Sequence, residues 1–473
     1  MKRKQILLVF IMSCLLALTG CFKKQETVKE VKLDPDNPVT ITLWHYYNGA
    51  QQTAFDKMVA EFNDTVGREK GIYVETYAQG DVYDLRQVVL DAANKKAGAS
   101  EMPDIFSAYA DTAYEINKLG LVADLRPYLT EVEINDYVGS YIEEGQFEKE
   151  GELKIFPIAK ATEILALNET DWKKFAKATG AKKKDLLTME GVAKTAGKYY
   201  EWSKGKAFFG RDSLANYFYI GARQFGVDLL TTENGKVTLN FDRDVVKKLW
   251  DNYYVPYVKG WYTSEAKFRS DDMQVGNIIA YVGSSSGASF YPTEVLLDDQ
   301  NKYKIEVGVY EAPAFQDGEK YAVQQGAGMV VTNKNDEEVY ASLEFLKWFT
   351  DSTRNMEFSS MSSYLPVKKD ANSQKLLDEV LPNDSNVKET LSVALKTVNS
   401  SIMYTAKATE GSSDVRTILE DSMQEKAVKD QKAVKKARKK GMSYEEATKP
   451  YLMEDNFEEW YEKTKEQLTD AIQ

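Results

Sequence analysis

Apolar and polar positions change their period several times along the first third of the chain. In the stretch VTITLWHYY, apolar Val39, Ile41 and Leu43 alternate with polar or aromatic neighbours, which predicts a strand. The next segment predicts an amphipathic helix, because one helical face carries Phe55, Met58, Val59 and Phe62. Alternation returns at residues 72–78, which predicts a second strand.

The same order continues to about residue 120. A helix with Leu85, Val88, Val89 and Ala92 on one face is followed by a strand in PDIFSAY and a helix that stops near Gly120. Three strand–helix units predict an α/β domain with a largely parallel sheet. Ligands of such sheets bind beyond the carboxyl ends of the strands. These ends are residues 45–49, 78–84 and 108–112, which are rich in Tyr, Asp and Asn.

The rest of the chain is helical in its middle and returns to strands later. Strands are predicted in YKIEVGVYEAP and YAVQQGAGMVVTN, and a helix from about Asp336 keeps Val339, Leu343 and Leu346 on one face. A terminal helix, NFEEWYEKTKEQLTDAI, is expected to dock on the body. The basic run from Lys432 to Lys440 is interpreted as a solvated helix surface, with contact to a membrane surface or an anionic polymer as the alternative.

The N-terminus has the layout of an export signal. Lys2, Arg3 and Lys4 precede the uncharged run 6–18, which is too short to cross roughly 30 Å of hydrocarbon as a helix. The run ends in Leu-Thr-Gly-Cys21, which resembles the lipobox of bacterial lipoproteins. The resemblance implies cleavage before Cys21 and acylation of its thiol, with residues 1–20 as the signal peptide and 21–38 as a tether. An uncleaved signal anchor is the alternative.

Composition narrows the possible chemistry. The net charge of −12 argues against nucleic-acid binding. His45 is the only histidine, and Cys14 leaves with the signal, so histidine-dependent hydrolases and thiolate metal sites are disfavoured. We therefore expect no cofactor, no metal and no catalytic residues, although a pair of carboxylates of glycosidase type stays open. The 29 tyrosines and 7 tryptophans are compatible with a carbohydrate site. His45 and Trp44 are expected to pack internally.

Several segments together resemble one family. ITLWHYYNGAQQTAFDKMVAEFN, MPDIFSAYAD, LKIFPIAKATEILALN, FRSDDMQVGNIIAYVGSSSGA and the late stretch from QQGAGMVVTN to SSYLPVKK occur in the order and spacing of substrate-binding lipoproteins of ABC importers. These belong to the extracellular solute-binding family for oligosaccharides and polyols. The resemblance implies an α/β, two-lobe periplasmic-binding-protein-like fold with a ligand cleft between the lobes and multiple crossings.

The resemblance also implies an organisation and partners. The expected N-terminal lobe comprises residues 39–158 and 286–344, and the C-terminal lobe 159–285 and 345–473. The expected partners are a sugar or polyol, the membrane permease of an ABC importer, and the membrane itself through Cys21. The chain lacks a phosphate-binding loop of the G-x-x-x-x-G-K-[ST] type, so ATP hydrolysis would reside on other chains. We expect a monomer on the outer face of the cell membrane.

The resemblance implies ligand contacts from loops and crossings. The expected ligand residues after the first three strands are Tyr46, Tyr47, Tyr83, Asp84 and Tyr109, and Tyr364 is expected to contact the ligand from the SSYLP turn of the C-terminal lobe. Those of the first crossing are Lys160 and Thr162, and those of a second crossing are Ser285 and Ser286. Asp212 is either a ligand contact or a helix N-cap. Gly326 lies in a strand and permits close approach to the backbone or a bulge.

The identity of the ligand stays open among several classes. Ala110 and Ala408 stand where the glycerol-phosphate binders of the family carry an acidic residue and a phosphate-holding arginine, which favours a neutral sugar or polyol. A phosphorylated polyol, a peptide or a polyamine in the same fold is the alternative. A glycosidase that uses Asp84 and Asp212 is a further alternative.

Overall fold

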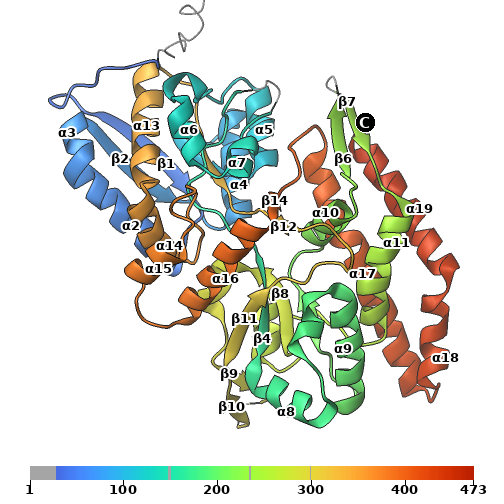
Figure 1. Ribbon diagram of the computed structural model, residues 1–473. Coiled ribbons are helices and arrows are strands. Elements are labelled where there is room, and N and C mark those ends of the chain that lie inside the picture. The colour runs from blue at the N-terminus through green and yellow to red at the C-terminus, as the bar shows by residue number, and fades with distance from the viewer. Residues whose placement is uncertain (1–27, 148–150, 234–235, 299) are drawn as a thin grey trace, which may run out of the picture.

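The computed structural model describes residues 28–147, 151–233, 236–298 and 300–473. The predicted signal peptide and Cys21 lie outside these residues. The described chain forms two lobes, each with its own four-stranded sheet and its own apolar core (Figure 1). None of the helices in these ranges combines the length and apolar character needed to cross a membrane.

The first lobe is built on the strand–helix units at the start of the chain. Its sheet has the order β13-β3-β1-β2, in which β1 is parallel to β2 and β3, and β13 is antiparallel to β3. The strands are β1 (Val39–His45), β2 (Ile72–Ala78), β3 (Ile105–Ala108) and β13 (Gly328–Val331). The helices are α2 (Gly49–Phe62), α3 (Arg68–Lys70), α4 (Val82–Ala93), α5 (Ala110–Lys118), α6 (Glu131–Asp136), α7 (Gly139–Glu143), α13 (Asp336–Phe349) and α14 (Ser352–Ser362).

The predicted helical faces of this lobe are confirmed. All four apolar residues of the α2 face are buried, and so are Val339, Leu343 and Leu346 of α13. In α4, Leu85, Val89 and Ala92 are buried, and Val88 packs partly against the same core. Because β1, β2 and β3 are parallel, their carboxyl ends meet at one edge of the sheet, as the pattern indicated.

The second lobe has a mixed sheet in the order β11-β4-β8-β5, in which only β5 and β8 are parallel. Its strands are β4 (Glu163–Asn168), β5 (Phe209–Arg211), β8 (Ala280–Ser284) and β11 (Val307–Glu311). Its helices are α8 (Glu169–Thr179), α9 (Met189–Trp202), α10 (Leu214–Gln224), α11 (Arg243–Val258), α12 (Arg269–Gln274), α17 (Ser412–Lys439), α18 (Tyr444–Thr448) and α19 (Glu454–Ala471).

Smaller elements complete the molecule. Two-stranded sheets are formed by β6 (Leu230–Glu233) with β7 (Lys236–Leu239), β9 (Glu294–Leu296) with β10 (Lys302–Lys304), and β12 (Tyr321–Val323) with β14 (Ile402–Tyr404). Helices α15 (Gln374–Val380) and α16 (Asn386–Ser400) pack with α14 around Met356, Leu377 and Leu391. The short helices are η1 (Asn63–Gly67), η2 (Arg126–Tyr128), η3 (Lys183–Leu187), η4 (Ser285–Phe290) and η5 (Lys449–Leu452).

The lobe boundaries differ from those expected for residues 286 onward. Residues 286–323 stay with the second lobe, because β11 pairs with β4 and because Tyr291, Val295 and Val309 share a core with β4. The expected boundary at 344 falls inside α13, where residues on both sides of it pack in the first-lobe core together with α14. The terminal helix α19 docks as predicted, with Phe457, Trp460 and Leu468 buried in the second lobe.

Candidate functional site

Three chain segments meet between the lobes. Residues 158–163 run from the first lobe into β4, and residues 323–328 return from β12 to β13. These two segments are paired, because the Ala161 amide donates to the Gln325 carbonyl at 2.8 Å and the Gln325 amide donates back at 3.0 Å. The third segment is the one around Leu365. It joins the other two because the Lys160 amide donates to the Leu365 carbonyl at 3.0 Å. We call these paired segments the hinge.

Lys160 lies in the hinge, but its amine is already engaged. The side chain is fully buried, and its Nζ is 2.7 Å from Glu144 Oε2 and 2.8 Å from the Gly326 carbonyl oxygen. Gln324 donates to the same carboxylate at 2.5 Å. The predicted ligand residue Lys160 therefore cross-links both crossings to the end of α7.

Gly326 allows the backbones of the two crossings to approach each other closely. Its φ of +101° lies in the region that favours glycine, and an added Cβ would lie 3.1 Å from the Ala159 carbonyl oxygen. The close approach expected at this position is thus made by the backbone of the first crossing.

Tyrosines of the first lobe gather at the carboxyl edge of its sheet. The hydroxyls of Tyr46 and Tyr364 are 3.4 Å apart. Desolvation raises the pKa of Tyr109, and the nearby phenols of Tyr364 and Tyr83 raise it further. The pKa of Tyr364 is raised by burial and lowered in part by hydrogen bonds with Tyr46 and Ser286. Four predicted residues, Tyr46, Tyr109, Ser286 and Tyr364, therefore lie together, and Tyr83 lies beside them with 77% of its surface exposed.

Backbone geometry presents Tyr364 to this cluster. Helix α14 ends at Ser362, and its C-cap residue Ser363 is a non-glycine residue with a left-handed φ of +64°. The turn directs the following Tyr364 ring against Tyr47, with ring centroids 6.0 Å apart. Tyr364 is 6% exposed, so its ring forms the boundary between the core and the tyrosine cluster.

Two predicted residues of this lobe have local structural partners. Tyr47 is 2% exposed and packs in the core against Phe55 and Phe358. Asp84 completes a capping box at the start of α4, in which the Asp81 amide donates to Asp84 Oδ2 at 3.1 Å. The Asp81-x-x-Asp84 spacing is a sequence signal for such a cap.

Polar residues of the second lobe lie beside the hinge. Glu163 and Arg211 form a buried ion pair, and Asn216 donates to Glu163 Oε1 at 3.1 Å and to Gln325 Oε1 at 3.0 Å. Burial raises the pKa of Glu163, and the Arg211 guanidinium opposes that rise. The pairing leaves this part of the site close to neutral.

Arg416 of α17 extends this network toward the first lobe. Its Nη2 donates to Asn216 Oδ1 at 3.0 Å. Its charge also reaches across the lobes, because it lowers the pKa of Tyr109 in the first lobe, which burial otherwise raises. We call Tyr46, Tyr109, Tyr364, Asn216 and Arg416 the interlobe site. Asn216 and Arg416 were missed from the sequence, since they come from separate helices without a local motif.

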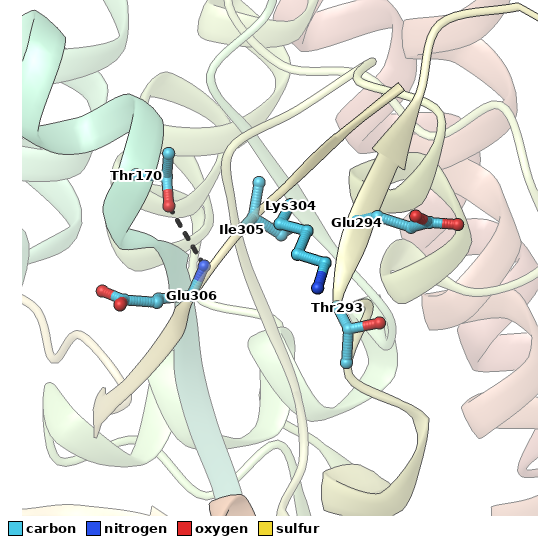
Figure 2. Close-up of a pocket in the computed structure, with 6 residues that line it drawn as sticks. All are labelled: Thr170, Thr293, Glu294, Lys304, Ile305 and Glu306. Carbon is cyan, nitrogen blue, oxygen red and sulfur yellow. Dashed lines mark hydrogen bonds between the residues drawn. The ribbon is translucent and has the colours of Figure 1, made fainter. Parts of the chain in front are cut away.

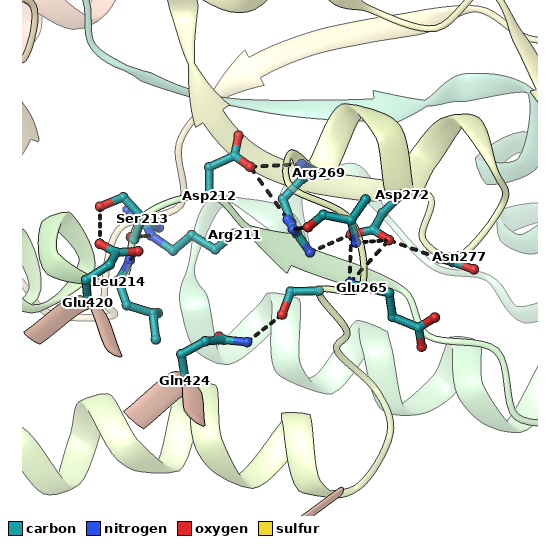
Figure 3. Close-up of polar contacts among 12 residues, drawn as sticks. Arg211, Asp212, Ser213, Leu214, Glu265, Arg269, Asp272, Asn277, Glu420 and Gln424 are labelled. Carbon is teal, nitrogen blue, oxygen red and sulfur yellow. Dashed lines mark hydrogen bonds and ion pairs between the residues drawn. The ribbon is translucent and has the colours of Figure 1, made fainter. Parts of the chain in front are cut away.

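Asp212 lies at the edge of this network and is not the helix cap (Figure 3). The N-cap of α10 is Ser213, whose side chain accepts from the Asn216 amide at 3.2 Å. Asp212 Oδ1 accepts from the Arg269 backbone amide at 2.9 Å. The guanidinium of Arg269 also forms an ion pair with Asp272. Burial raises the pKa of Asp212 to about 6, and the contacts with Arg269 lower it in part.

The serines after β8 contact the first crossing without forming a crossing of their own. The Ser285 amide donates to the Thr162 carbonyl at 2.8 Å, and the Thr162 amide donates to Ser285 Oγ at 3.2 Å. The predicted second crossing at residues 284–287 is wrong, because η4 leads back into β9 and β11 of the same lobe. Among the described residues, the buried Thr162 hydroxyl has no hydrogen-bond partner.

A separate hollow of about 430 Å³ (Figure 2) lies beside β9 and β10, at the outer end of the second lobe (Figure 1). It is lined by Thr170, Thr293, Glu294, Lys304, Ile305 and Glu306. The Glu306 amide donates to Thr170 Oγ1 at 3.1 Å, so its polar groups partly satisfy each other. It contains no aromatic platform and none of the predicted ligand residues.

The sequence profile of the bacterial extracellular solute-binding protein family matches residues 57–388, which is more than half of the chain. The chain belongs to this family of bacterial extracellular solute-binding proteins. The family resemblance and the two-lobe fold predicted from the sequence are therefore confirmed. No curated protein matches this solute-binding protein.

Solved structures share the fold at low sequence identity. The cyclic alpha-maltosyl-1,6-maltose binding protein from Arthrobacter globiformis is 17% identical, with a TM-score of 0.69 over 92% of this chain and 99% of that one. UgpB from Mycobacterium tuberculosis, solved with glycerophosphocholine, is 16% identical, with a TM-score of 0.66 over 92% and 99%. An ABC transporter solute binding protein from Agrobacterium radiobacter K84, solved with ribitol, is 20% identical, with a TM-score of 0.60 over 84% and 95%.

Proposed function

We propose that this solute-binding protein captures a sugar, oligosaccharide or polyol at the interlobe site and delivers it to the permease of an ABC importer. The observation that carries the proposal is the meeting of Tyr46, Tyr109 and Tyr364 with Asn216 and Arg416 across the lobes. Tyrosine offers a flat apolar face to a sugar ring and a hydroxyl for hydrogen bonding. The amide and the guanidinium supply further polar groups that fix orientation.

Most side chains at and beside the interlobe site are uncharged or paired, which favours a neutral ligand. Glu163 and Arg211 neutralise each other, tyrosine hydroxyls are uncharged at neutral pH, and among the residues of the interlobe site Arg416 alone carries a charge. The structures of similar fold, one of a cyclic alpha-maltosyl-1,6-maltose binding protein and one solved with ribitol, support the same class of ligand. We expect the ligand to be bound without turnover, since Asp84 is engaged in a helix cap and Asp212 with Arg269.

A phosphorylated polyol is the second candidate, and one observation favours it. Arg416 is exposed toward the tyrosines, and a guanidinium binds phosphate well. UgpB, of similar fold, was solved with glycerophosphocholine. Native mass spectrometry of protein purified with its endogenous ligand separates the two candidates by mass, because a phosphate group adds a fixed increment to the polyol.

The test is a screen of saccharides and polyols by thermal shift, followed by calorimetric titration. A ligand that binds the folded state raises its stability by RT ln(1 + [L]/Kd). We expect Tyr364→Ala to weaken binding by about tenfold or more, and Tyr364→Phe by less, because it keeps the ring. Tyr73→Ala is the matched control, since Tyr73 is an exposed tyrosine at the opposite end of β2. A broad screen without any shift contradicts the proposal.

We also propose that the protein is held on the outer face of the membrane by acylation of Cys21. A single acyl chain anchors weakly, so more than one chain is expected on the mature N-terminus. The intact mass of membrane-extracted protein would show the lipid. Cys21→Ser should move the protein out of the membrane fraction, whereas Cys14→Ser, in the predicted signal peptide, should leave it there. An unmodified mass at Cys21 would contradict the anchor.

A further inference from the structure

The second half of α17 carries a strong positive charge in an acidic protein. Residues 429–440 contain seven cations and one carboxylate, while the whole chain has a net charge of −12. Six of these cations are exposed at the end of the helix: Lys432, Lys435, Lys436, Arg438, Lys439 and Lys440. We call these six residues the basic tip.

The basic tip has few internal partners. Lys435 lies 3.7 Å from Glu265, in a pair in which both side chains are more than half exposed. Arg438 donates to the Met442 carbonyl at 3.0 Å. Within the described ranges, the remaining four lysines have no ion-pair partner. The charge of the tip is therefore presented to the surroundings.

The helix itself does not account for this clustering. Like charges three or four residues apart, such as Lys432 with Lys435 and Lys436, destabilise a helix. The helix dipole favours cations only in the last turn, so it leaves Lys432 and Lys435 unexplained. The opposite face of α17 holds the helix on the lobe through buried Gln431 and Val434. The packing of α17 therefore depends on the hydrogen bonds of Gln431 and the apolar contacts of Val434, and does not require the cations of the tip.

The neighbouring groove does not share the charge of the tip. A groove of about 460 Å³ between α17 and α19 has cations and carboxylates in equal number on its walls: Asp421, Glu425, Lys426, Lys429, Glu459 and Lys463. The excess of positive charge is thus confined to the end of α17.

We propose that the basic tip binds an extracellular polyanion with repeated phosphate groups. Several flexible cations along one face suit a polymer, because each neutralised phosphate releases counterions and the contacts add up. The chain enters the first lobe at one end of the molecule, while α18 and the end of α17 lie at the other (Figure 1). With the N-terminus at the membrane, the tip points away from it. This choice of polymer over membrane rests on the proposed anchor.

The test measures binding of the full chain in detergent to long-chain inorganic polyphosphate at several salt concentrations. The test variant is the triple substitution Lys432→Gln, Lys436→Gln and Lys439→Gln. We expect it to weaken binding by about tenfold or more at low salt, and to reduce the slope of log affinity against log salt by roughly two to three.

The matched control removes the same net charge elsewhere on the lobe. Lys173, Lys302 and Lys396 are exposed lysines that each pair with a carboxylate, and their triple Gln variant should bind polyphosphate like the native chain. Equal losses in both triple variants would show an effect of net charge alone and overturn the proposal.

Three further measurements test which anion binds and whether the basic tip acts separately from the interlobe site. Equal affinity for monomeric phosphate would overturn the proposal of a polymer. Tip-dependent binding to phosphatidylglycerol vesicles without binding to polyphosphate would assign the tip to a membrane and overturn it as well. Polyphosphate binding that is unchanged in Tyr364→Ala supports the tip as a separate surface. The saccharide screen tests the proposed function, and the Cys21→Ser fractionation tests the proposed anchor. A negative result in either experiment is therefore distinct from a failure of the basic tip to bind polyphosphate.

Discussion

His45 is the last residue of β1, and its ring packs in the core against Tyr47 and Phe55. It is 1% exposed, and its Nδ1 accepts from the Tyr47 amide at 3.2 Å. Burial lowers its pKa from 6.5 to about 4, and the charge of Asp56 opposes this only in part. The neutral ring is thus part of the folded state.

We predict that this histidine makes the protein less stable in mild acid. Since its folded pKa is depressed, its contribution is present above pH 6.5 and is lost as the pH falls toward 4. The full effect is about 3 kcal/mol. His45→Asn keeps an acceptor for the Tyr47 amide and should flatten this part of the pH dependence of unfolding by urea. Because the chain has one histidine, one imidazole NMR signal reports its pKa; a value near 6.5 would contradict the prediction.

The pKa of Asp212 is shifted in the opposite direction to that of His45. Its pKa is raised to about 6 mainly by burial, so its stabilising contribution is present below pH 3.8 and is lost as the pH rises through 6. We predict that Asp212→Asn keeps the bond to the Arg269 amide and gains stability relative to the native chain between pH 4.5 and 7.5. The gain is at most about 3 kcal/mol, reduced by the 29% exposure of the side chain. The prediction would be refuted if the free energies of unfolding of Asp212→Asn and the native chain differed by the same amount at pH 4.5 and at pH 7.5.

Single residues show what the pattern can and cannot predict. The sequence predicts Tyr46, Tyr109 and Tyr364 because they follow strand ends or a recognisable turn, and the structure brings them together. Tyr47 was predicted as a ligand residue, but its ring packs in the core, since neighbouring residues after a strand face opposite sides. The direction of a ring after the last strand residue depends on tertiary packing.

At the scale of elements, the hinge depends on one buried ion pair. The Lys160 amine joins Glu144 at the end of α7 to the carbonyl of Gly326 in the return crossing. Both charges are desolvated, with side chains 1% and 5% exposed. Removal of one partner leaves the other charge buried without compensation.

We predict that Lys160→Met destabilises the protein by about 3 to 5 kcal/mol, and that adding Glu144→Gln recovers part of this loss. Chemical unfolding followed by circular dichroism measures both variants. A lysine that acted chiefly on the ligand would instead leave unfolding unchanged and weaken saccharide binding. Lys174→Met, which removes an amine that is 59% exposed and pairs with Asp171, is the control and should change stability by less than about 1 kcal/mol.

Elements with a clear period were predictable, and the connections between them were less so. The faces of α2, α4 and α13 follow from apolar spacing alone. The small residues after β8 looked like a crossing, although β11 then pairs with β4 in the same sheet. Pairing between strands more than a hundred residues apart is decided by tertiary contacts, which leave no local signal.

At the scale of the whole molecule, the lobes touch away from the hinge. Lys118 at the end of α5 forms an ion pair with Glu410, just before α17. The helices α5 and α17 belong to different lobes and contact each other there. This contact closes the side of the molecule on which the interlobe site lies, because Arg416 is in the first turns of the same α17.

We predict that this contact tunes ligand release. A two-lobe binder closes around its ligand by a hinge motion. Its apparent affinity decreases when a smaller fraction of the molecules is in the closed form. Lys118→Glu places two carboxylates together and should weaken binding by about twofold to fivefold, mainly through faster dissociation. The double variant Lys118→Glu with Glu410→Lys restores the pair and should recover the native dissociation rate. Both side chains are exposed, so the effect should shrink at high salt. A single variant that equals the native chain at low salt would show that the lobes close without this pair.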